Sequence, residues 1–301
     1  MRPFFSLRIL LFGGALALLA AGMLVFFVPR PLPVASAPAP VIATPKPAWP
    51  EHSVIGASVE GRSIDEYTYW PAGVEASSGL KHLVFVGGIH GGYEWNSVVV
   101  AYDLMDYLQA NASVIPHNEA ITVIPDANPD AVYKATGKEG RITATDIDLS
   151  ADLSADRFNA DGVDLNRNFD CHWKATAVWQ NKTVSAGTAP FSEPEAQALR
   201  DYLLPAKPAA VVFWHSQANG VYASQCDGGI LPQTLTIMNT YARASGYPAI
   251  KTFDAYPTTG ASEDWLASQG IPAVTVELSS HKNVEWEKNL KGILALLEQF
   301  K

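Results

Sequence analysis

Positive charge is scarce in this sequence. Lys and Arg together number 21 against 30 Asp and Glu, the net charge at pH 7 is −9, and no long basic run occurs. A protein that binds nucleic acid needs a basic surface that neutralises phosphates, so we expect no nucleic-acid partner. The negative charge is instead typical of a protein kept soluble by self-repulsion.

Apolar runs of membrane length are absent beyond the N-terminal region. There, Arg2 and Arg8 lead into twenty uncharged, mostly apolar residues, 9–28, which as a helix would span a hydrocarbon core of about 30 Å. We predict an uncleaved membrane anchor at 1–30, with a cleaved signal peptide as the alternative. Either way the positive end stays in the cytoplasm, so the rest of the chain is expected to be exported, either membrane-anchored on the extracytoplasmic side or secreted.

The segment after this leader is rich in proline and alanine. Proline stiffens such a segment into an extended spacer, which predicts a linker at 31–52. The remaining residues, 53–301, are enough for one large domain with its own buried core, and they contain no internal repeat.

Cysteine is rarer still, with only Cys171 and Cys226 in 301 residues. A cysteine pair in an exported protein is readily oxidised, so we predict a disulfide between the two. Two buried free thiols are the alternative.

Short apolar runs alternate with helical patterns along the predicted domain. The runs are rich in Val, Ile or Phe, as strands buried on both faces of a sheet are, and they lie at 82–89, 120–125, 209–214 and 271–276. The helical patterns lie at 97–109, 192–204, 232–246 and 283–300. Ser192 and Glu195 are spaced as a capping box at the start of the second helix. The alternation predicts a single α/β domain with a mixed, mostly parallel central sheet flanked by helices.

Polar side chains follow each of the four predicted strands. His90 and Glu94 come after the first strand, Asn128 after the second, His215 after the third, and Glu277 closes the fourth. Ligand sites of open α/β sheets lie at the carboxyl ends of the strands, so we expect these side chains to converge. Two imidazoles and a carboxylate with an open fourth position form a catalytic zinc site, and a further carboxylate nearby is suited to act as general base.

These residues lie in motifs that resemble the zinc carboxypeptidases related to carboxypeptidase A. The resemblance covers the domain from SVEGRSI (58–64) to the last helix, and the motifs occur in the family's order: GGIHGGYEWN (87–96), NPDAV (128–132), RFNADGVDLNRNF (157–169), PFSEPEAQAL (190–199), FWHSQ (213–217), YPTTGASEDW (256–265) and TVEL (275–278). DGVDLNRNF and SEPEAQAL are the most specific of them. The resemblance implies a zinc metallocarboxypeptidase that hydrolyses a C-terminal peptide bond.

The resemblance also assigns the metal and the acid–base residues. It implies that His90, Glu94 and His215 bind one Zn²⁺ and that Glu277 is the general base and later the proton donor. The family usually has two residues between the first His and the Glu, whereas this sequence has three, GGY. Glycine tolerates unusual backbone angles, so a local bulge can absorb the extra residue and Glu94 remains the predicted ligand. The alternative is that Glu94 points away from the metal.

Further residues match the family's substrate-binding positions. Arg157 is implied to polarise the scissile carbonyl and hold the oxyanion, with Arg141 as the alternative within a long acidic insertion. Asn166 and Arg167 match the pair that binds the terminal carboxylate of the substrate, and Tyr256 matches the mobile tyrosine that closes over it. An arginine binds a carboxylate bidentately, which favours removal of one C-terminal residue over cleavage inside a chain.

Glu263 lies where family members place the residue at the bottom of the side-chain pocket. A buried carboxylate there needs a cationic partner, which predicts a preference for a basic or diaminopimelate-type C-terminal residue. A rim glutamate in solvent is the alternative. The other histidines, His172 and His281 among them, are expected on the surface or in structural roles.

The expected substrate is a peptide or a peptidoglycan stem peptide. Two other interpretations stay open: a deacylase of small N-acyl amino-acid derivatives, which is a known variation of this fold, and a metal-free peptide-binding module that lacks catalysis. Zinc content and chelator-sensitive turnover separate the last of these from both enzymes.

Overall fold

The computed structural model describes residues 50–71 and 79–301. The predicted anchor at 1–30 and the predicted linker up to residue 49 lie outside these residues. The first strand begins at Glu51, so regular structure starts two residues before the predicted domain boundary. No helix within the described residues is long and apolar enough to cross a membrane.

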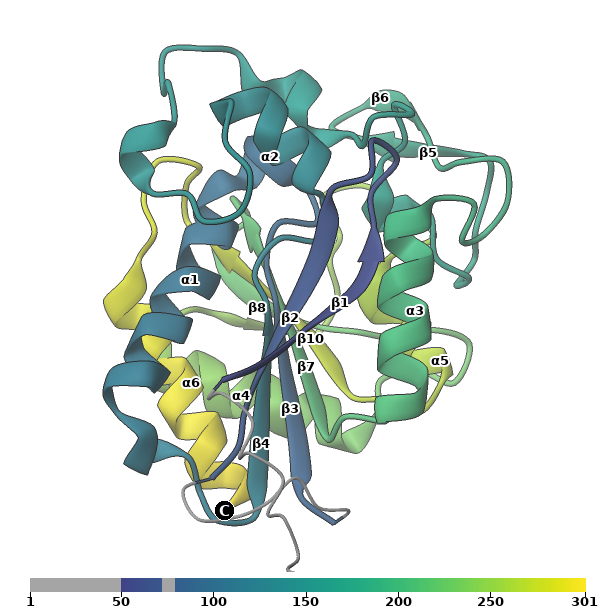
Figure 1. Cartoon of the computed structure of the whole chain (residues 1–301). Coiled ribbons are helices and arrows are strands. Elements are labelled where there is room, and N and C mark those ends of the chain that lie inside the picture. The colour runs from purple at the N-terminus through teal and green to yellow at the C-terminus, as the bar shows by residue number, and fades with distance from the viewer. Residues whose placement is uncertain (1–49, 72–78) are drawn as a thin grey trace, which may run out of the picture. The chain divides into compact units, whose positions relative to one another are not determined.

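A mixed sheet forms the centre of the described chain (Figure 1), with the strand order β1-β2-β4-β3-β7-β10-β8-β9. Its strands are β1 (Glu51–Ala57), β2 (Ser63–Tyr69), β3 (Lys81–Val86), β4 (Glu119–Ile124), β7 (Ala210–Ser216), β8 (Gly220–Ala223), β9 (Ala249–Ile250) and β10 (Ala273–Leu278). The four middle strands, β4, β3, β7 and β10, run parallel to one another. The β1, β2 and β8 strands pair antiparallel with their inner neighbours, and β9 is parallel to β8. The predicted fold class is confirmed.

Helices cover both faces of this sheet. They are α1 (Trp95–Ala110), α2 (Pro129–Thr136), α3 (Pro194–Ala206), α4 (Pro232–Ser245), α5 (Ser262–Ser268) and α6 (Trp286–Phe300). Figure 1 shows α1 and α6 on one side of the sheet and α3 and α5 on the other. A separate hairpin of β5 (Thr176–Trp179) and β6 (Lys182–Ser185) lies outside the main sheet.

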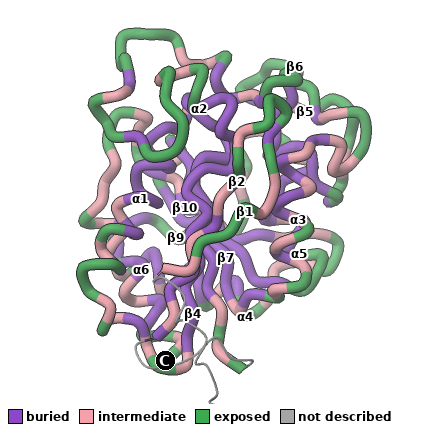
Figure 2. Tube along the Cα trace, viewed as in Figure 1, coloured by how far each residue is buried: buried purple, intermediate pink, exposed green. Residues whose placement is uncertain are grey.

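The middle strands are buried on both faces, as their apolar runs predict. On β3, Leu83 and Phe85 point into a core shared with α1, α4 and α6. The alternating residues Val84 and Val86 point into a second core, shared with α3 and α5. This alternation follows from the two-residue period of a strand. Figure 2 shows the buried chain concentrated in the central strands and the exposed chain at the periphery.

The predicted capping box at the start of α3 is wrong. The helix begins at Pro194, and its N-cap residue Glu193 makes no side-chain capping bond. Ser192 instead donates its hydroxyl to the Glu193 carboxylate, and the carboxylate of Glu195 accepts from the backbone N–H of Val59 on the neighbouring chain segment. Proline at the first helical position already has the φ angle of a helix, so the turn forms without the box.

Candidate active site

Three of the parallel strands bring the predicted metal ligands and base to one edge of the sheet. His90 follows the end of β3, His215 lies near the end of β7, and Glu277 lies near the end of β10. Glu277 and His215 are direct partners in the parallel register of β10 and β7. The convergence predicted from strand order is therefore present in the structure. Asn128 follows β4 but serves the backbone, since its side-chain oxygen accepts from the N–H of Ala131 at the start of α2.

His90, Glu94 and His215 form a tight group of buried side chains, with relative exposures of 4%, 3% and 1%. The Nδ1 atom of His90 lies 2.9 Å from Oε1 of Glu94. The Nδ1 atom of His215 lies 3.1 Å from Oε2 of Glu94 and 3.2 Å from Nδ1 of His90. Each histidine thus turns the same ring nitrogen toward one common point.

These distances fit a zinc ion. Bonds of about 2.0–2.2 Å at tetrahedral angles place two ligand atoms of one zinc roughly 3.3 Å from each other. The two imidazole nitrogens lie 3.2 Å from each other, and each lies 2.9 or 3.1 Å from one oxygen of the Glu94 carboxylate. Two imidazoles and one carboxylate are also the ligand set of catalytic zinc centres. The donor atoms that the chain provides therefore fit the metal.

The additional residue between His90 and Glu94 is absorbed in a tight turn. Residues Gly91–Glu94 form a single 3-10 turn that leads into α1, and Gly91 has a φ of +47°. A Cβ atom on Gly91 would lie 2.2 Å from the Cβ of Ala131, and one on Gly92 would lie 2.2 Å from the Cβ of Ala135. Both glycines are required because the turn packs directly on α2. The turn directs Glu94 toward the two histidines, so the alternative in which Glu94 points away is wrong.

A carboxylate stands behind each histidine. Nε2 of His90 lies 3.3 Å from Asp164, and Nε2 of His215 lies 3.0 Å from Glu263. Such outer carboxylates fix the ring orientation of a metal-binding histidine and increase its basicity. Asp164 lies inside the DGVDLNRNF motif, but its contact with His90 is not readable from the motif.

Arg157 reaches the same place from the turn before that motif. It is 2% exposed, donates from Nε to Asp164 at 2.9 Å, and places a terminal nitrogen 3.3 Å from Glu94. Its guanidinium also stacks on the ring of Trp179 at 4.7 Å. Arg141, the alternative, is exposed and pairs with Asp106 on the surface. Of the two arginines, Arg157 therefore lies at the metal group and Arg141 does not.

Asn166 and Arg167 line the same cavity. The side-chain oxygen of Asn166 accepts from the backbone N–H and the hydroxyl of Ser262, at 2.7 and 2.9 Å. Arg167 is 3% exposed and donates only to the carbonyl oxygens of Asn166 and Val178. Its Nε is buried without a hydrogen-bond partner, and no carboxylate of the described residues lies within ion-pair distance of its guanidinium.

Glu277 and Tyr256 complete the cavity, which has a volume of ≈ 260 Å³. Oε2 of Glu277 accepts from the backbone N–H of Ala218 at 3.0 Å. Burial, and next the negative charge of Glu94, raise the pKa of Glu277 to about 7. The ring of Tyr256 packs edge-on against Phe253 at 4.9 Å. A cavity of this size is slightly smaller than typical small-ligand sites, which span about 300–1,000 Å³, and suits a single terminal residue.

The buried histidines and carboxylates of the metal group shift one another's pKa values. Burial alone would raise the pKa of Glu94, but His90 and His215 outweigh it and hold that pKa well below its usual range. Burial alone would lower the pKa of His215, but the hydrogen bonds to Glu263 and Glu94 raise it to about 10. Without a metal, therefore, the carboxylates retain a proton on the imidazole that a bound cation displaces.

Glu263 lines the cavity, as its predicted place in the side-chain pocket requires, but its carboxylate faces His215. It is 3% exposed, so it is no rim residue in solvent. Its carboxylate already has a cationic partner in His215 and also accepts from the hydroxyls of Ser262 and Thr275. These contacts direct the carboxylate toward His215 within the protein. Glu263 faces His215 because the first turn of α5 packs beside the end of β7 in the tertiary structure.

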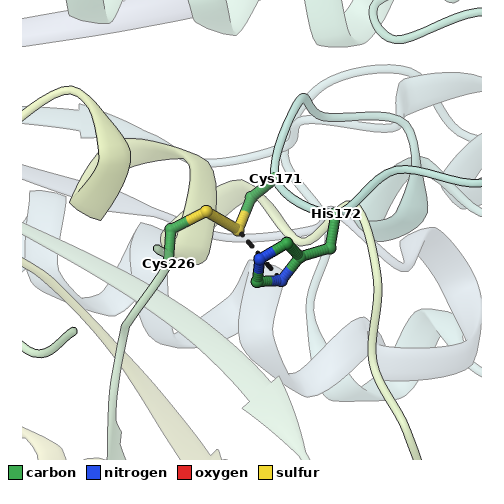
Figure 3. A group of neighbouring side chains, drawn as sticks. All are labelled: Cys171, His172 and Cys226. Carbon is green, nitrogen blue, oxygen red and sulfur yellow. Dashed lines mark hydrogen bonds between the residues drawn. A yellow bond between two sulfur atoms is a disulfide. The ribbon is translucent and has the colours of Figure 1, made fainter. Parts of the chain in front are cut away.

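Cys171 and Cys226 form a disulfide, as predicted, with their Cα atoms 6.1 Å apart. Figure 3 shows His172 beside this bond, with Nδ1 3.8 Å from the sulfur of Cys171. Because both sulfurs are used in the disulfide, this group offers no thiolate to a metal. His172 pairs with Asp227 at the surface, whereas His281 lines the cavity and shares a 2.7 Å hydrogen bond with the hydroxyl of Ser216. The expected surface or structural role therefore describes His172 but omits the place of His281 on the cavity wall.

The fold and this site define a class of protein. It is an α/β protein whose parallel strands present a mononuclear metal site of two histidines and one glutamate, with an arginine and a second glutamate on the same cavity. The sequence profile described as "Zinc carboxypeptidase" matches residues 41–296. The chain therefore belongs to the zinc carboxypeptidase family, a family of zinc metallopeptidases, and its cofactor is one Zn²⁺.

Individual relatives agree with this assignment. The chain is 26% identical over 251 residues to gamma-D-glutamyl-L-diamino acid endopeptidase 1 of Lysinibacillus sphaericus, which covers 76% of this chain and 60% of the relative. It is 26% identical over 263 residues to carboxypeptidase B of Astacus astacus, covering 80% and 83% of the two chains. The chain thus spans about three fifths of the endopeptidase and most of the carboxypeptidase.

Solved structures show the same fold. The murein-tripeptide amidase MpaA of Escherichia coli O157 superposes with a TM-score of 0.57 and 24% identity, covering 83% of this chain and 92% of the amidase.

Proposed function

We propose that the protein is a zinc-dependent carboxypeptidase that removes one residue from the free C-terminus of a peptide. The observation that carries this proposal is Arg167, a buried arginine on the wall of the cavity that also contains the metal group, for which residues 50–71 and 79–301 supply no carboxylate partner. An unpaired buried charge is costly, and a planar guanidinium matches a carboxylate. The terminal carboxylate of a peptide supplies that missing partner.

The residues around the cavity have complementary roles in amide hydrolysis. When bound to His90, Glu94 and His215, zinc supplies a Lewis acid that polarises the carbonyl and acidifies water. Glu277 takes a proton from the attacking water and returns it to the leaving amine, for which a pKa near 7 suits both directions. Arg157 faces the metal group with a permanent charge and stabilises the developing oxyanion. Tyr256, which also lines the cavity, covers the bound substrate.

The proposed substrates are peptidoglycan stem peptides that end in diaminopimelate, or other peptides with a basic terminal residue. The names of two relatives, a gamma-D-glutamyl-L-diamino acid endopeptidase and a carboxypeptidase B, support this choice. Asp264 supports it from the cavity wall, since among the residues that the structure describes its one hydrogen-bond partner is the backbone N–H of Gln225. Burial raises the pKa of Asp264 to about 6, although the positive charge of Arg167 offsets part of that rise. An ammonium group of the substrate would give Asp264 a direct cationic partner.

The test is a panel of peptides and muropeptides followed by mass spectrometry, with and without a chelator. We expect release of single C-terminal residues, sensitivity to the chelator, and at least about a hundredfold lower kcat/KM for C-terminally amidated peptides, which lose charged hydrogen bonds to Arg167. Equal cleavage of free and amidated peptides would contradict the role of Arg167. Release of an acyl group from small N-acyl amino acids with no peptide cleavage would favour the deacylase.

Asp264→Asn tests the side-chain preference separately. The variant should lose most of its preference for lysine or diaminopimelate over leucine at the C-terminus, because the cation then faces a neutral amide. Cleavage of leucine-ended peptides is the internal control and should stay close to that of the unaltered protein. An unchanged ratio of cleavage rates for the basic and the leucine-ended peptides would exclude Asp264 as the residue that recognises the side chain of the substrate.

We also propose that the catalytic domain is exported and stays attached through residues 1–30. The apolar run at 9–28 and the Pro/Ala-rich segment after it support this proposal. Protease treatment of intact cells that express the full chain, with N-terminal sequencing of the mature protein, tests it. Protection of the domain in intact cells would exclude export, and a new N-terminus beyond residue 30 would show cleavage of the leader.

A further inference from the structure

Glu263 contacts the outer nitrogen of a proposed zinc ligand. Its Oε1 lies 3.0 Å from Nε2 of His215, and both side chains are almost completely buried. The other ring nitrogen of His215, Nδ1, faces Glu94 and His90. When Nε2 carries a proton that it donates to a carboxylate, the lone pair of a neutral imidazole lies on Nδ1, the atom that faces the metal position.

The carboxylate of Glu263 is itself held in place. Oε2 accepts from the hydroxyl of Ser262 at 3.0 Å, and Oε1 accepts from the hydroxyl of Thr275 at 3.1 Å. These residues come from α5 and β10, so two elements orient one carboxylate. The carboxylate of Glu263 is therefore fixed from three directions, by His215, Ser262 and Thr275.

The two histidines differ in how their outer nitrogens are held. Asp164, behind His90, also accepts a 2.9 Å hydrogen bond from Arg157, so its charge is shared. For Nε2 of His215, Glu263 is the one hydrogen-bond partner within the described residues. Removing Glu263 would thus leave His215 free to rotate or to change tautomer, whereas His90 would be unaffected.

We propose that Glu263 is a positioning residue that sets the orientation and tautomer of His215 for zinc, and that it is not the residue that selects the substrate side chain. This inference rests on the proposed role of His215 as a zinc ligand. The family resemblance assigns position 263 to substrate specificity. In this chain, we infer, that position supports the metal site instead.

Zinc affinity without any substrate is the first readout. Glu263→Ala and Glu263→Gln are compared with the unaltered protein by competition against a chromophoric zinc chelator. Loss of an outer partner of this kind weakens metal binding about 10- to 100-fold, and we expect the alanine variant to lie in this range. The glutamine variant keeps the size and one acceptor oxygen, so it should lose less.

Glu66→Gln is the matched control. Glu66 is also a buried glutamate that accepts from two hydroxyls, those of Ser53 and Thr68, but it lies on β2 away from the cavity. Its zinc affinity should equal that of the unaltered protein. If Glu263→Ala does not fold, the glutamine variant with its near-identical shape still gives the comparison.

Substrate preference is the second readout. The ratio of kcat/KM for lysine-ended to leucine-ended peptides should stay the same in Glu263→Gln, while the zinc concentration needed for activity rises. A folded Glu263→Ala protein with zinc affinity within twofold of the unaltered protein would overturn the proposal, as would a changed preference with unchanged affinity. Because zinc binding is measured alone, the inference can stand even if the protein binds zinc and cleaves no peptide.

Discussion

At the scale of single residues, the site depends on which atoms of each side chain face one another. His90 and His215 turn Nδ1 toward a common point and Nε2 toward a carboxylate. The sequence motifs predict that His90, Glu94 and His215 come together, and the structure groups them, because a residue's place after a strand is readable from the chain. The motifs do not predict that Glu263 contacts His215. That contact joins α5 to β7, which are far apart in the sequence, so no motif spacing indicates it.

Arg157 gives a prediction at this scale. Replacing it by alanine removes a fixed positive charge from the cavity, and we expect kcat to fall about a hundredfold or more. Arg141→Ala is the control, since its pair with Asp106 is on the surface and such pairs contribute about 0–1 kcal/mol. Zinc content is measured in both variants to show that the metal group is intact. Near-normal turnover of a zinc-loaded Arg157→Ala enzyme would exclude the assigned role.

At the scale of elements, the buried strands and long helices were predictable and the edges were not. The β3, β4, β7 and β10 strands are continuous apolar runs because helices cover both of their faces. The β1 strand is largely exposed and β9 has two residues, so neither has a clear apolar pattern. The α2 and α5 helices, with eight and seven residues, are too short for a helical period to appear, and yet α5 carries Glu263.

The turn between β3 and α1 gives a prediction about packing. A Cβ atom at position 92 would lie 2.2 Å from Ala135 and 2.9 Å from the carbonyl oxygen of Ala131, so Gly92→Ala must displace α2 or the turn. We expect a loss of about 1–3 kcal/mol in the free energy of unfolding, together with weaker zinc binding. Gly228→Ala is the control, because no atom lies within 4 Å of its added Cβ. Equal stability of the two variants in urea would contradict the packing argument.

The first residue of β4 gives a prediction about pH. Glu119 is fully buried, neither carboxylate oxygen has a hydrogen-bond partner in the described part of the chain, and burial raises its pKa to about 7. Folding thus favours the protonated carboxyl, and its destabilising effect grows between the unfolded pKa, about 4.3, and pH 7. Glu119→Gln should therefore stabilise the protein by on the order of 2–3 kcal/mol at pH 8 and have little effect near pH 4.5. Urea unfolding at both pH values measures this; an equal effect at the two values would refute it.

At the scale of the whole molecule, metal binding and folding are coupled. The ligands come from residues 90, 94 and 215, so the site exists only when β3 and β7 are side by side in the folded sheet. A ligand that binds only the folded state stabilises it, by about 2.7 kcal/mol at a free concentration a hundredfold above Kd. For a domain of this size we expect zinc to raise the Tm by roughly 5–10 °C.

Thermal unfolding with zinc and with excess chelator measures this shift, and Glu94→Ala is the control that should show little of it. A Tm that is the same with and without zinc in the unaltered protein would contradict the metal site itself.

The sequence alone determined the alternation of strands and helices, the disulfide pair, the catalytic family and the residues that gather around the metal. These properties depend on local pattern and on motifs whose order along the chain is preserved. Only the tertiary structure decided that Glu94 reaches the metal group despite the longer spacing, that Arg157 and not Arg141 lies there, and that Glu263 faces His215. Each of these depends on which elements pack side by side, and packing joins residues whose distance along the chain carries no information about their distance in space.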